Sequence, residues 1–155
     1  MTQKGVGGEI LAKIERSIDI EAPPEKVWPM VYWDKIPQWL DMIKKAEFTS
    51  KEKDKQGAKA HVAGEIAGIK AEWDAETTEW TENKRFAWRT TAGTFTGFGS
   101  MTLSPIKTGT KATFLMDYDL PYSFLGKLVD KLRVSKQMDK EFKIGMEKLK
   151  EIAER

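Results

Sequence analysis

The C-terminal stretch from Pro121 to Arg155 carries an apolar stripe at helical spacing, with charged residues in most of the positions between. The stripe consists of Leu125, Leu128, Leu132, Met138, Phe142, Met146, Leu149 and Ile152. This spacing predicts one long amphipathic helix whose stripe is buried. At 1.5 Å per residue, ~33 residues span roughly 50 Å, whereas a compact chain of this length has a radius of gyration of about 15 Å. We therefore expect the helix to cross the whole domain.

The middle of the chain alternates apolar and polar residues with a period of two, which is typical of half-buried β-strands. The first and clearest case runs from Ile10 to Ile20. The expected strands cover residues 10–20, 45–50, 58–69, 71–80, 85–91, 95–103 and 111–120. Stretches rich in charge or glycine separate most of them, and such stretches favour turns. The pattern therefore predicts seven antiparallel strands.

Two short helices are expected after the first strand. Pro23-Pro24-Glu25 begins one of them, because proline is tolerated in a first helical turn and an acidic residue there complements the helix dipole. Pro29 lies just past that turn and should kink or tighten the helix. Pro37 begins the second helix, which carries Trp39, Leu40 and Ile43.

The long C-terminal stripe needs a partner of similar length. Two short helices cannot cover it, so we expect it to lie across one face of the sheet, in an α+β fold without βαβ repeats. The stripe includes Ser135 and Gly145 at positions where large apolar residues would be expected. Methionines, which are flexible fillers, lie nearby. The helix is therefore expected to cover a space as well as to fill a core.

Composition indicates one domain, because 155 residues suffice for one sizeable core and are too few for two. We expect residues 1–8 to form a flexible N-terminal tail and residues 9–155 to form the domain. The chain has no cysteine and a single histidine, His61. Thiolate sites, disulfides and histidine clusters are therefore excluded, and we expect no metal and no cofactor.

Charge is nearly balanced, with 26 Lys and Arg residues against 24 Asp and Glu residues, interspersed along the chain. A nucleic-acid partner is therefore not expected. The first nine residues lack the apolar core of a secretory signal. Residues 90–106 are uncharged but rich in Thr, Ser and Gly, which disfavours a membrane span, so no stable membrane insertion is expected. The expected location is cytoplasmic.

Three short motifs resemble a known family. Residues 20–28, Ile-Glu-Ala-Pro-Pro-Glu-Lys-Val-Trp, resemble the I-x-A-P-x-E-x-V-W motif of the polyketide cyclase/dehydrase-like proteins in the START-like superfamily, also called SRPBCC. Pro37-Gln38-Trp39 resembles the P-x-W of these proteins, and Gly109-Thr110-Lys111-Ala112-Thr113 resembles the G-T-[RK]-V-T that opens their last strand. With the C-terminal helix, the resemblance covers residues 10–153 in element order.

This resemblance implies a helix-grip fold, in which a curved seven-stranded antiparallel sheet wraps around the long helix and leaves a cavity between them. It also implies binding of hydrophobic small molecules such as lipids, sterols, quinones or polyketides, with cyclase or dehydratase activity in some members. The motif residues are fold markers in the family. No catalytic residue is therefore carried over onto this chain.

The phases of the strands and of the helix predict which residues line the cavity. The expected ligand-binding residues are Trp88, Phe95, Met101, Phe114, Met116, Tyr118, Leu128, Ser135, Met138 and Phe142, with Tyr118 and Ser135 as polar handles. For any single aromatic residue, Trp73 among them, a core position is the more frequent alternative. Arg16 is in phase with the inner face of its strand. It is either at an edge, displaced by a bulge, or directed into the cavity.

Three hypotheses for function remain open. The first is a protein that binds or carries a hydrophobic small molecule. The second is an aromatic-ring cyclase or dehydratase, which needs a titratable residue in the cavity; Arg16, Tyr118 and His61 are the candidates. A strand histidine near a charged turn is more often at the surface, and Asp117 and Asp119, on the face opposite Tyr118, are more often solvated. The third is a protein-binding module, which an exposed apolar patch would indicate.

Overall fold

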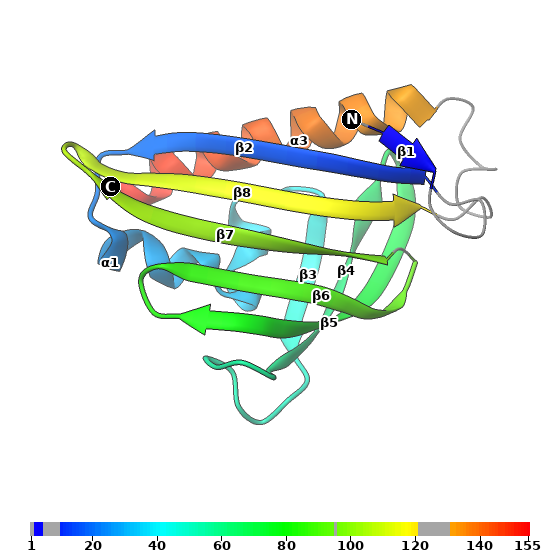
Figure 1. Ribbon diagram of the computed structural model, residues 1–155, viewed down its shortest axis with the longest axis horizontal. Helices are drawn as coiled ribbons and strands as arrows, with labels where there is room; N and C mark the ends of the chain where they lie inside the picture. Colours follow the sequence, from blue (N-terminus) through cyan, green and yellow to red (C-terminus); the bar gives the residue numbers. More distant parts are fainter. Residues whose placement is uncertain (1, 5–9, 95, 121–130) are drawn as a thin grey trace.

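A computed structural model describes residues 2–4, 10–94, 96–120 and 131–155. One antiparallel sheet dominates it, with the strand order β1-β2-β8-β7-β6-β5-β4-β3 (Figure 1). The strands are β1 (Thr2–Lys4), β2 (Ile10–Ile20), β3 (Ile43–Phe48), β4 (Lys59–Ile66), β5 (Ile69–Thr81), β6 (Arg85–Gly93), β7 (Thr96–Ile106) and β8 (Gly109–Leu120). The predicted α+β class and helix-grip architecture are confirmed.

The seven predicted strands correspond to β2–β8, with boundaries shifted by a few residues. The eighth strand, β1, lies within the segment expected to be a loose tail. It pairs with the start of β2, with Thr2 opposite Ala12 and Lys4 opposite Ile10. Three residues are too few for a periodic pattern to be recognised. The sheet therefore has one short strand more than the sequence indicated.

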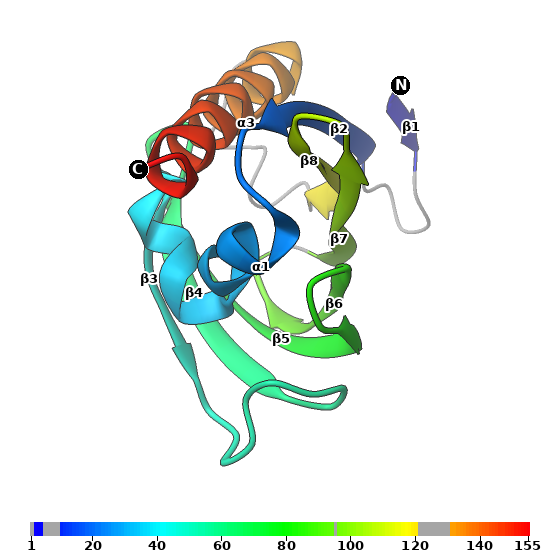
Figure 2. The ribbon, with the colours of Figure 1, turned by 90° about the vertical axis from the view of Figure 1, so that its left-hand side faces the viewer.

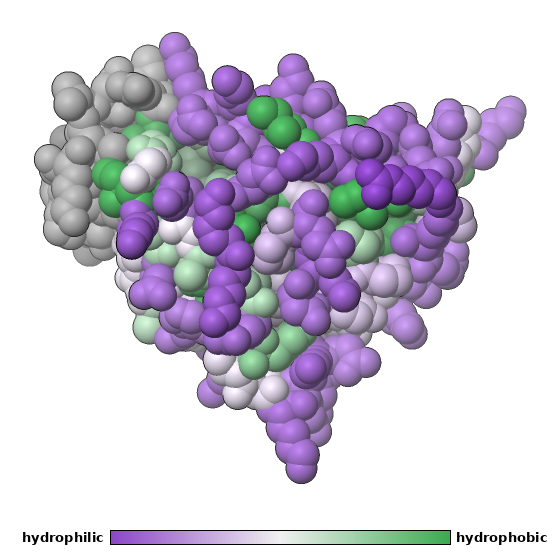
Figure 3. All heavy atoms as spheres, turned by 180° about the vertical axis from the view of Figure 1, so that it is seen from behind, coloured by the Kyte–Doolittle hydropathy of each residue, from purple (hydrophilic) through white to green (hydrophobic). Residues whose placement is uncertain are grey.

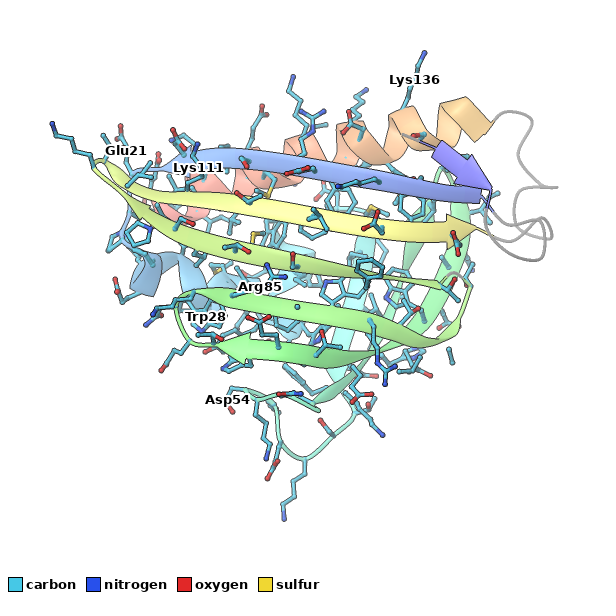
Figure 4. All side chains as sticks on the ribbon, viewed as in Figure 1. Glu21, Trp28, Asp54, Arg85, Lys111 and Lys136 are labelled. Carbon is cyan, nitrogen blue, oxygen red and sulfur yellow. The ribbon has the colours of Figure 1, made fainter. Side chains whose placement is uncertain are left out.

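The long helix α3 (Lys131–Ala153) closes the curled sheet. Figure 2 shows the sheet curving from β2 through β7 and β5 to β3, with α3 lying between its two ends. Met138, Phe142, Met146 and Leu149 are buried, and Lys136 projects outward (Figure 4). The predicted single helix is confirmed over this range. The predicted residues Leu125 and Leu128, and the side chain of Leu132, lie outside the described part of the chain.

Gly145 allows α3 to approach the segment that precedes β3. A Cβ atom at Gly145 would lie 2.9 Å from Cδ1 of Leu40 and 3.1 Å from the carbonyl oxygen of Trp39. Lys148 Nζ also lies 2.6 Å from Asp41 Oδ1 on the same side of the helix. The small residue in the apolar stripe therefore serves close packing of the helix at this point, rather than leaving space.

The segment between β2 and β3 forms three short helical turns: α1 (Pro24–Val27), the 3₁₀ helix η2 (Trp28–Val31) and the 3₁₀ helix η3 (Trp33–Gln38). Pro29 lies where the α-helix tightens into the 3₁₀ helix, as expected. The second helix does not begin at Pro37. It begins at Trp33, after the extended residue Tyr32, whose carbonyl accepts the Lys35 N–H at 2.9 Å. Among the described helices, none is long and apolar enough to cross a bilayer.

The start of β8 is fixed against the turn that follows β2. The Thr110 hydroxyl is fully buried and donates to the carbonyl oxygen of Ala22 at 2.7 Å. Gly109 has a φ of +146°, and a Cβ atom there would lie 2.2 Å from the carbonyl oxygen of Ile20. The Gly-Thr pair thus joins β8 to the entry of α1 and holds the short helices on the sheet.

Candidate functional site

An apolar cavity of about 50 Å³ lies between α3, the η3–β3 segment and the inner face of the sheet. Its wall consists of Trp33, Ile36, Trp39, Leu40, Met42, Ile43, Val62, Ile66, Trp73, Trp88, Phe114, Met116, Met138 and Phe142. A volume of this size exceeds that needed for one water molecule. None of these fourteen residues carries a charge, so the wall favours apolar contents.

Aromatic contacts hold the wall in place. The rings of Phe114 on β8 and Phe142 on α3 stack with centroids 4.5 Å apart and an interplanar angle of 20°. Trp33 meets Phe86 and Trp88 edge-on, with centroids 5.3 and 5.5 Å apart. These contacts connect the helix, the sheet and the short η3 helix around the cavity.

A glycine on the neighbouring strand accommodates the ring of Trp88. Trp88 on β6 pairs with Gly99 on β7. A Cβ atom at Gly99 would lie only 2.6 Å from Cζ2 of Trp88. The indole therefore lies over the space that a side chain at position 99 would occupy, as expected where a group comes close to a strand glycine.

Five of the ten predicted ligand-binding residues line this cavity: Trp88, Phe114, Met116, Met138 and Phe142. Met101 and Tyr118 are buried but lie outside the wall, and Ser135 is half-buried. Phe95 and Leu128 lie outside the described residues. The structure therefore brings half of the predicted set together around one space.

Several wall residues were not predicted. Trp33, Ile36, Trp39, Leu40, Met42 and Ile43 belong to the η3–β3 segment, while Val62 and Ile66 come from β4. The density of apolar residues between positions 33 and 43 was a usable signal, because short surface helices seldom carry so many. Val62 and Ile66 occupy the even positions of an alternating strand, the same phase as the buried Ala60.

Tyr118 and Ser135 form a hydrogen-bonded pair at the end of α3 nearer its N-terminus. Burial raises the pKa of Tyr118 to about 12, and the negative charge of Asp139 acts in the same direction. The hydrogen bond between the Tyr118 and Ser135 side chains lowers that pKa, but by less than burial raises it. The phenol is therefore protonated at neutral pH and cannot serve there as a general base.

Arg16 forms an ion pair between β2 and α3. Its Nε lies 3.1 Å from Asp139 Oδ1, and its Nη2 lies 2.6 Å from Asp139 Oδ2. About a third of the Arg16 side chain remains exposed, 32%. Arg16 is not displaced by a bulge, since β2 and β8 pair there without a register shift, and it is not among the residues that line the cavity. It lies where the edge of the sheet meets α3. The two-pronged contact joins the helix to the first long strand beside the Tyr118–Ser135 pair.

His61 lies on the face of β4 opposite to the cavity-lining residue Val62. Its Nδ1 is 2.7 Å from Asp74 Oδ1, and its Nε2 is 3.4 Å from Glu72 Oε1. The hydrogen bond to Asp74 is the main cause of a raised pKa of His61. The histidine therefore belongs to a hydrogen-bonded cluster with two carboxylates on the outer face. Among the residues that the structure describes, no group of His, Asp and Glu could hold a metal ion.

Comparison with known proteins identifies the family. The model of the family described as "Polyketide cyclase / dehydrase and lipid transport" matches residues 12–154. The chain belongs to this family. The match includes β2 from Ala12 onward, β3 to β8, the short helices and α3, so the whole site described above lies inside the family domain.

Solved structures share the fold. The protein TTHA0849 from Thermus thermophilus aligns with a TM-score of 0.76 at 23% identity, covering 92% of this chain and 97% of that chain. The Zhui aromatase/cyclase from Streptomyces sp. R1128 aligns with a TM-score of 0.71 at 14% identity, covering 94% of each chain. A START superfamily protein from Mycobacterium smegmatis aligns with a TM-score of 0.69 at 16% identity, covering 92% of this chain and 97% of that chain. At these identities the likeness shows the fold alone.

One relative is similar in sequence. A Streptomyces lincolnensis protein of 17.2 kDa, described as uncharacterized, is 26% identical over 132 residues. The match covers 84% of this chain and 83% of the relative. The similarity therefore extends over most of both chains.

Proposed function

We propose that this protein binds a neutral hydrophobic small molecule in the cavity beneath α3. The observation that carries the proposal is the wall itself, in which all fourteen residues are aliphatic, aromatic or methionine and none is charged. A charged ligand group would lose its hydration there without gaining a counter-charge. The family description, which includes lipid transport, supports the same class of ligand.

The cavity must widen to hold a molecule of ordinary ligand size. Ligand sites typically enclose roughly 300–1,000 Å³, whereas this cavity has about 50 Å³. Three of its wall residues are methionines: Met42 directly before β3, Met116 on β8 and Met138 on α3. Methionine side chains have three rotatable bonds and adapt to irregular shapes. We infer that these three side chains move to admit the ligand.

A cyclase or dehydratase reaction in the same cavity has less support. Such a reaction needs an acid or base in contact with the substrate. Arg16 is paired with Asp139, His61 lies on the outer face, and Tyr118 lies outside the wall. None of the three candidates therefore lies among the residues that line the described cavity.

A protein-binding role has less support as well. Among the large apolar side chains described by the structure, Phe98 on β7 and Ile144 on α3 are the exposed ones, at 55% and 37%. Hydrophilic residues cover most of the face seen in Figure 3, with apolar residues showing only in small groups between them. No extended apolar patch comparable to a protein interface appears on that face.

The ligand-binding proposal predicts that, of two substitutions on one strand, one weakens dye binding and the other leaves it unchanged. Val62 lines the cavity and its neighbour Ala63 lies on the outer face of β4. Val62→Phe should fill part of the cavity and weaken binding of the neutral dye Nile red at least tenfold, at a stability cost of about 1–3 kcal/mol. Ala63→Phe adds the same ring outside and should leave dye binding unchanged. Equal affinity in both variants, measured by fluorescence titration, would place the dye elsewhere.

A further inference from the structure

One polar group in the cavity wall has no hydrogen-bond partner among the residues that the structure describes. The indole nitrogen of Trp33 is buried, in a side chain only 3% exposed, and none of the residues that the structure describes accepts its N–H. Trp39, also in the wall, differs in this respect, because its indole N–H donates to the carbonyl oxygen of Met30 at 2.8 Å. A buried donor without an acceptor is costly, so folded proteins rarely keep one without a reason.

The ring of Trp33 is held in a fixed orientation. Phe86 and Trp88 contact it edge-on, at interplanar angles of 80° and 62°. The η3 helix fixes its backbone, since Lys35 N–H and Trp39 N–H close the turns at either end of the helix. An aromatic face is at best a weak acceptor for an N–H group. A carbonyl oxygen brought into the cavity would therefore be the better partner.

We propose that the indole N–H of Trp33 anchors the ligand by donating a hydrogen bond to a neutral acceptor, a ketone- or quinone-type carbonyl oxygen. This inference rests on the proposed function and deepens it. It narrows the ligand class from hydrophobic molecules in general to hydrophobic molecules that carry a carbonyl group. A carboxylate or phosphate is disfavoured at this position, because the described wall contains no cation to compensate it.

A pair of isosteric probes tests the anchor. Acetophenone carries a C=O group where α-methylstyrene carries a C=CH₂ group, and the two molecules are otherwise alike. Acetophenone can therefore accept a hydrogen bond, whereas α-methylstyrene cannot. Trp33→Phe keeps an aromatic ring but removes the N–H. The ratio of the two affinities in the wild type, divided by the same ratio in the variant, cancels the difference in hydration between the probes. We expect acetophenone to lose roughly three- to tenfold more affinity than α-methylstyrene.

Trp39→Phe is the matched control. It removes from the same wall an indole whose N–H already donates to the carbonyl oxygen of Met30, and it leaves the Trp33 N–H and the contacts of its ring with Phe86 and Trp88 in place. It should therefore change the affinity for both probes by a similar factor. If Trp33→Phe also lowers both affinities equally, the proposed hydrogen bond from Trp33 to the ligand is contradicted, whereas the proposal that the cavity binds a hydrophobic ligand is not. If neither probe binds the wild-type protein, the proposed function and the anchor are overturned together.

The wild-type protein supplies a second readout that does not depend on a variant retaining its fold. The Trp33 indole N–H signal in a ¹H–¹⁵N spectrum should move downfield on saturation with acetophenone, as a new hydrogen bond forms. Saturation with α-methylstyrene should leave it without a comparable downfield shift. A Trp33 signal that responds identically to both probes contradicts the proposal.

Discussion

Replacing Phe142 by Ala is expected to lower the free energy of unfolding by about 3–5 kcal/mol. Phe142 is only 3% exposed, and its ring stacks on Phe114 at a centroid distance of 4.5 Å. Removing the ring leaves a void beside the existing cavity, and the surrounding side chains fill such a void only in part, so a cavity cost adds to the lost apolar burial. The contact also joins α3 to the sheet, so its loss weakens the main packing interface of the fold. Urea unfolding followed by circular dichroism measures the effect.

Phe98→Ala provides the control for this substitution. Phe98 lies on β7 with 55% of its surface exposed, so the same truncation removes little buried area there. We expect a cost of at most about 1 kcal/mol. A loss below about 1.5 kcal/mol for Phe142→Ala would show that α3 does not pack on the sheet through the Phe114–Phe142 stack.

Replacing Gly109 by Ala is expected to cost more than about 4 kcal/mol or to prevent folding. The φ angle of +146° strains any residue with a side chain, and the added Cβ would lie 2.2 Å from the carbonyl oxygen of Ile20 and 2.7 Å from the nitrogen of Ala22. Both are backbone atoms, and the neighbouring Thr110–Ala22 hydrogen bond holds the turn in place. The clash can therefore be relieved only by separating β8 from the β2–α1 turn. Urea unfolding of the purified variant measures the cost.

Gly57→Ala separates backbone strain from close packing. Gly57 also has a positive φ, +93°, but an added Cβ there would meet nothing within 4 Å. Strain alone should cost about 1–3 kcal/mol. Equal losses for the two variants would mean that the close approach of β8 to the β2–α1 turn contributes nothing.

The regular elements could be predicted from the sequence because each has a period. Alternation located β2 and β8, and the three- and four-residue spacing located α3 and its buried residues Met138, Phe142 and Leu149. The family resemblance agreed with this pattern, and the family match over residues 12–154 confirms it. Periodicity identifies the inner face of an element, which is why Trp88 and Met116 were predicted as wall residues and are found there.

The extent of the cavity could not be predicted. The periodicity of apolar residues shows which face of a strand or helix is buried, but not how far along that element the cavity reaches. Tyr118 has the same phase as Met116 on β8 and is also buried, yet it lies beyond the end of the cavity and bonds to Ser135 instead. Met101, which pairs with Phe114 across β7 and β8, is buried but does not reach the wall.

The contribution of residues 33–43 was missed for a related reason. This segment contains a 3₁₀ helix with Pro37 inside it, so its apolar residues follow neither a strand nor an α-helix period. The close contact at Gly145 positions Trp39 against α3, and ring contacts with Phe86 and Trp88 position Trp33 against β6. Such placement depends on contacts between residues far apart in the chain.

The most direct test of the account is to map where a small apolar molecule binds. In protein labelled with ¹³C at the methionine methyl groups, α-methylstyrene should cause saturable shifts in the signals of Met42, Met116 and Met138, which line the cavity. Met101, buried outside the wall, and Met30, which is half-buried, should show much smaller shifts. Signals that fail to saturate, or saturable shifts confined to Met30 and Met101, would contradict a ligand site beneath α3.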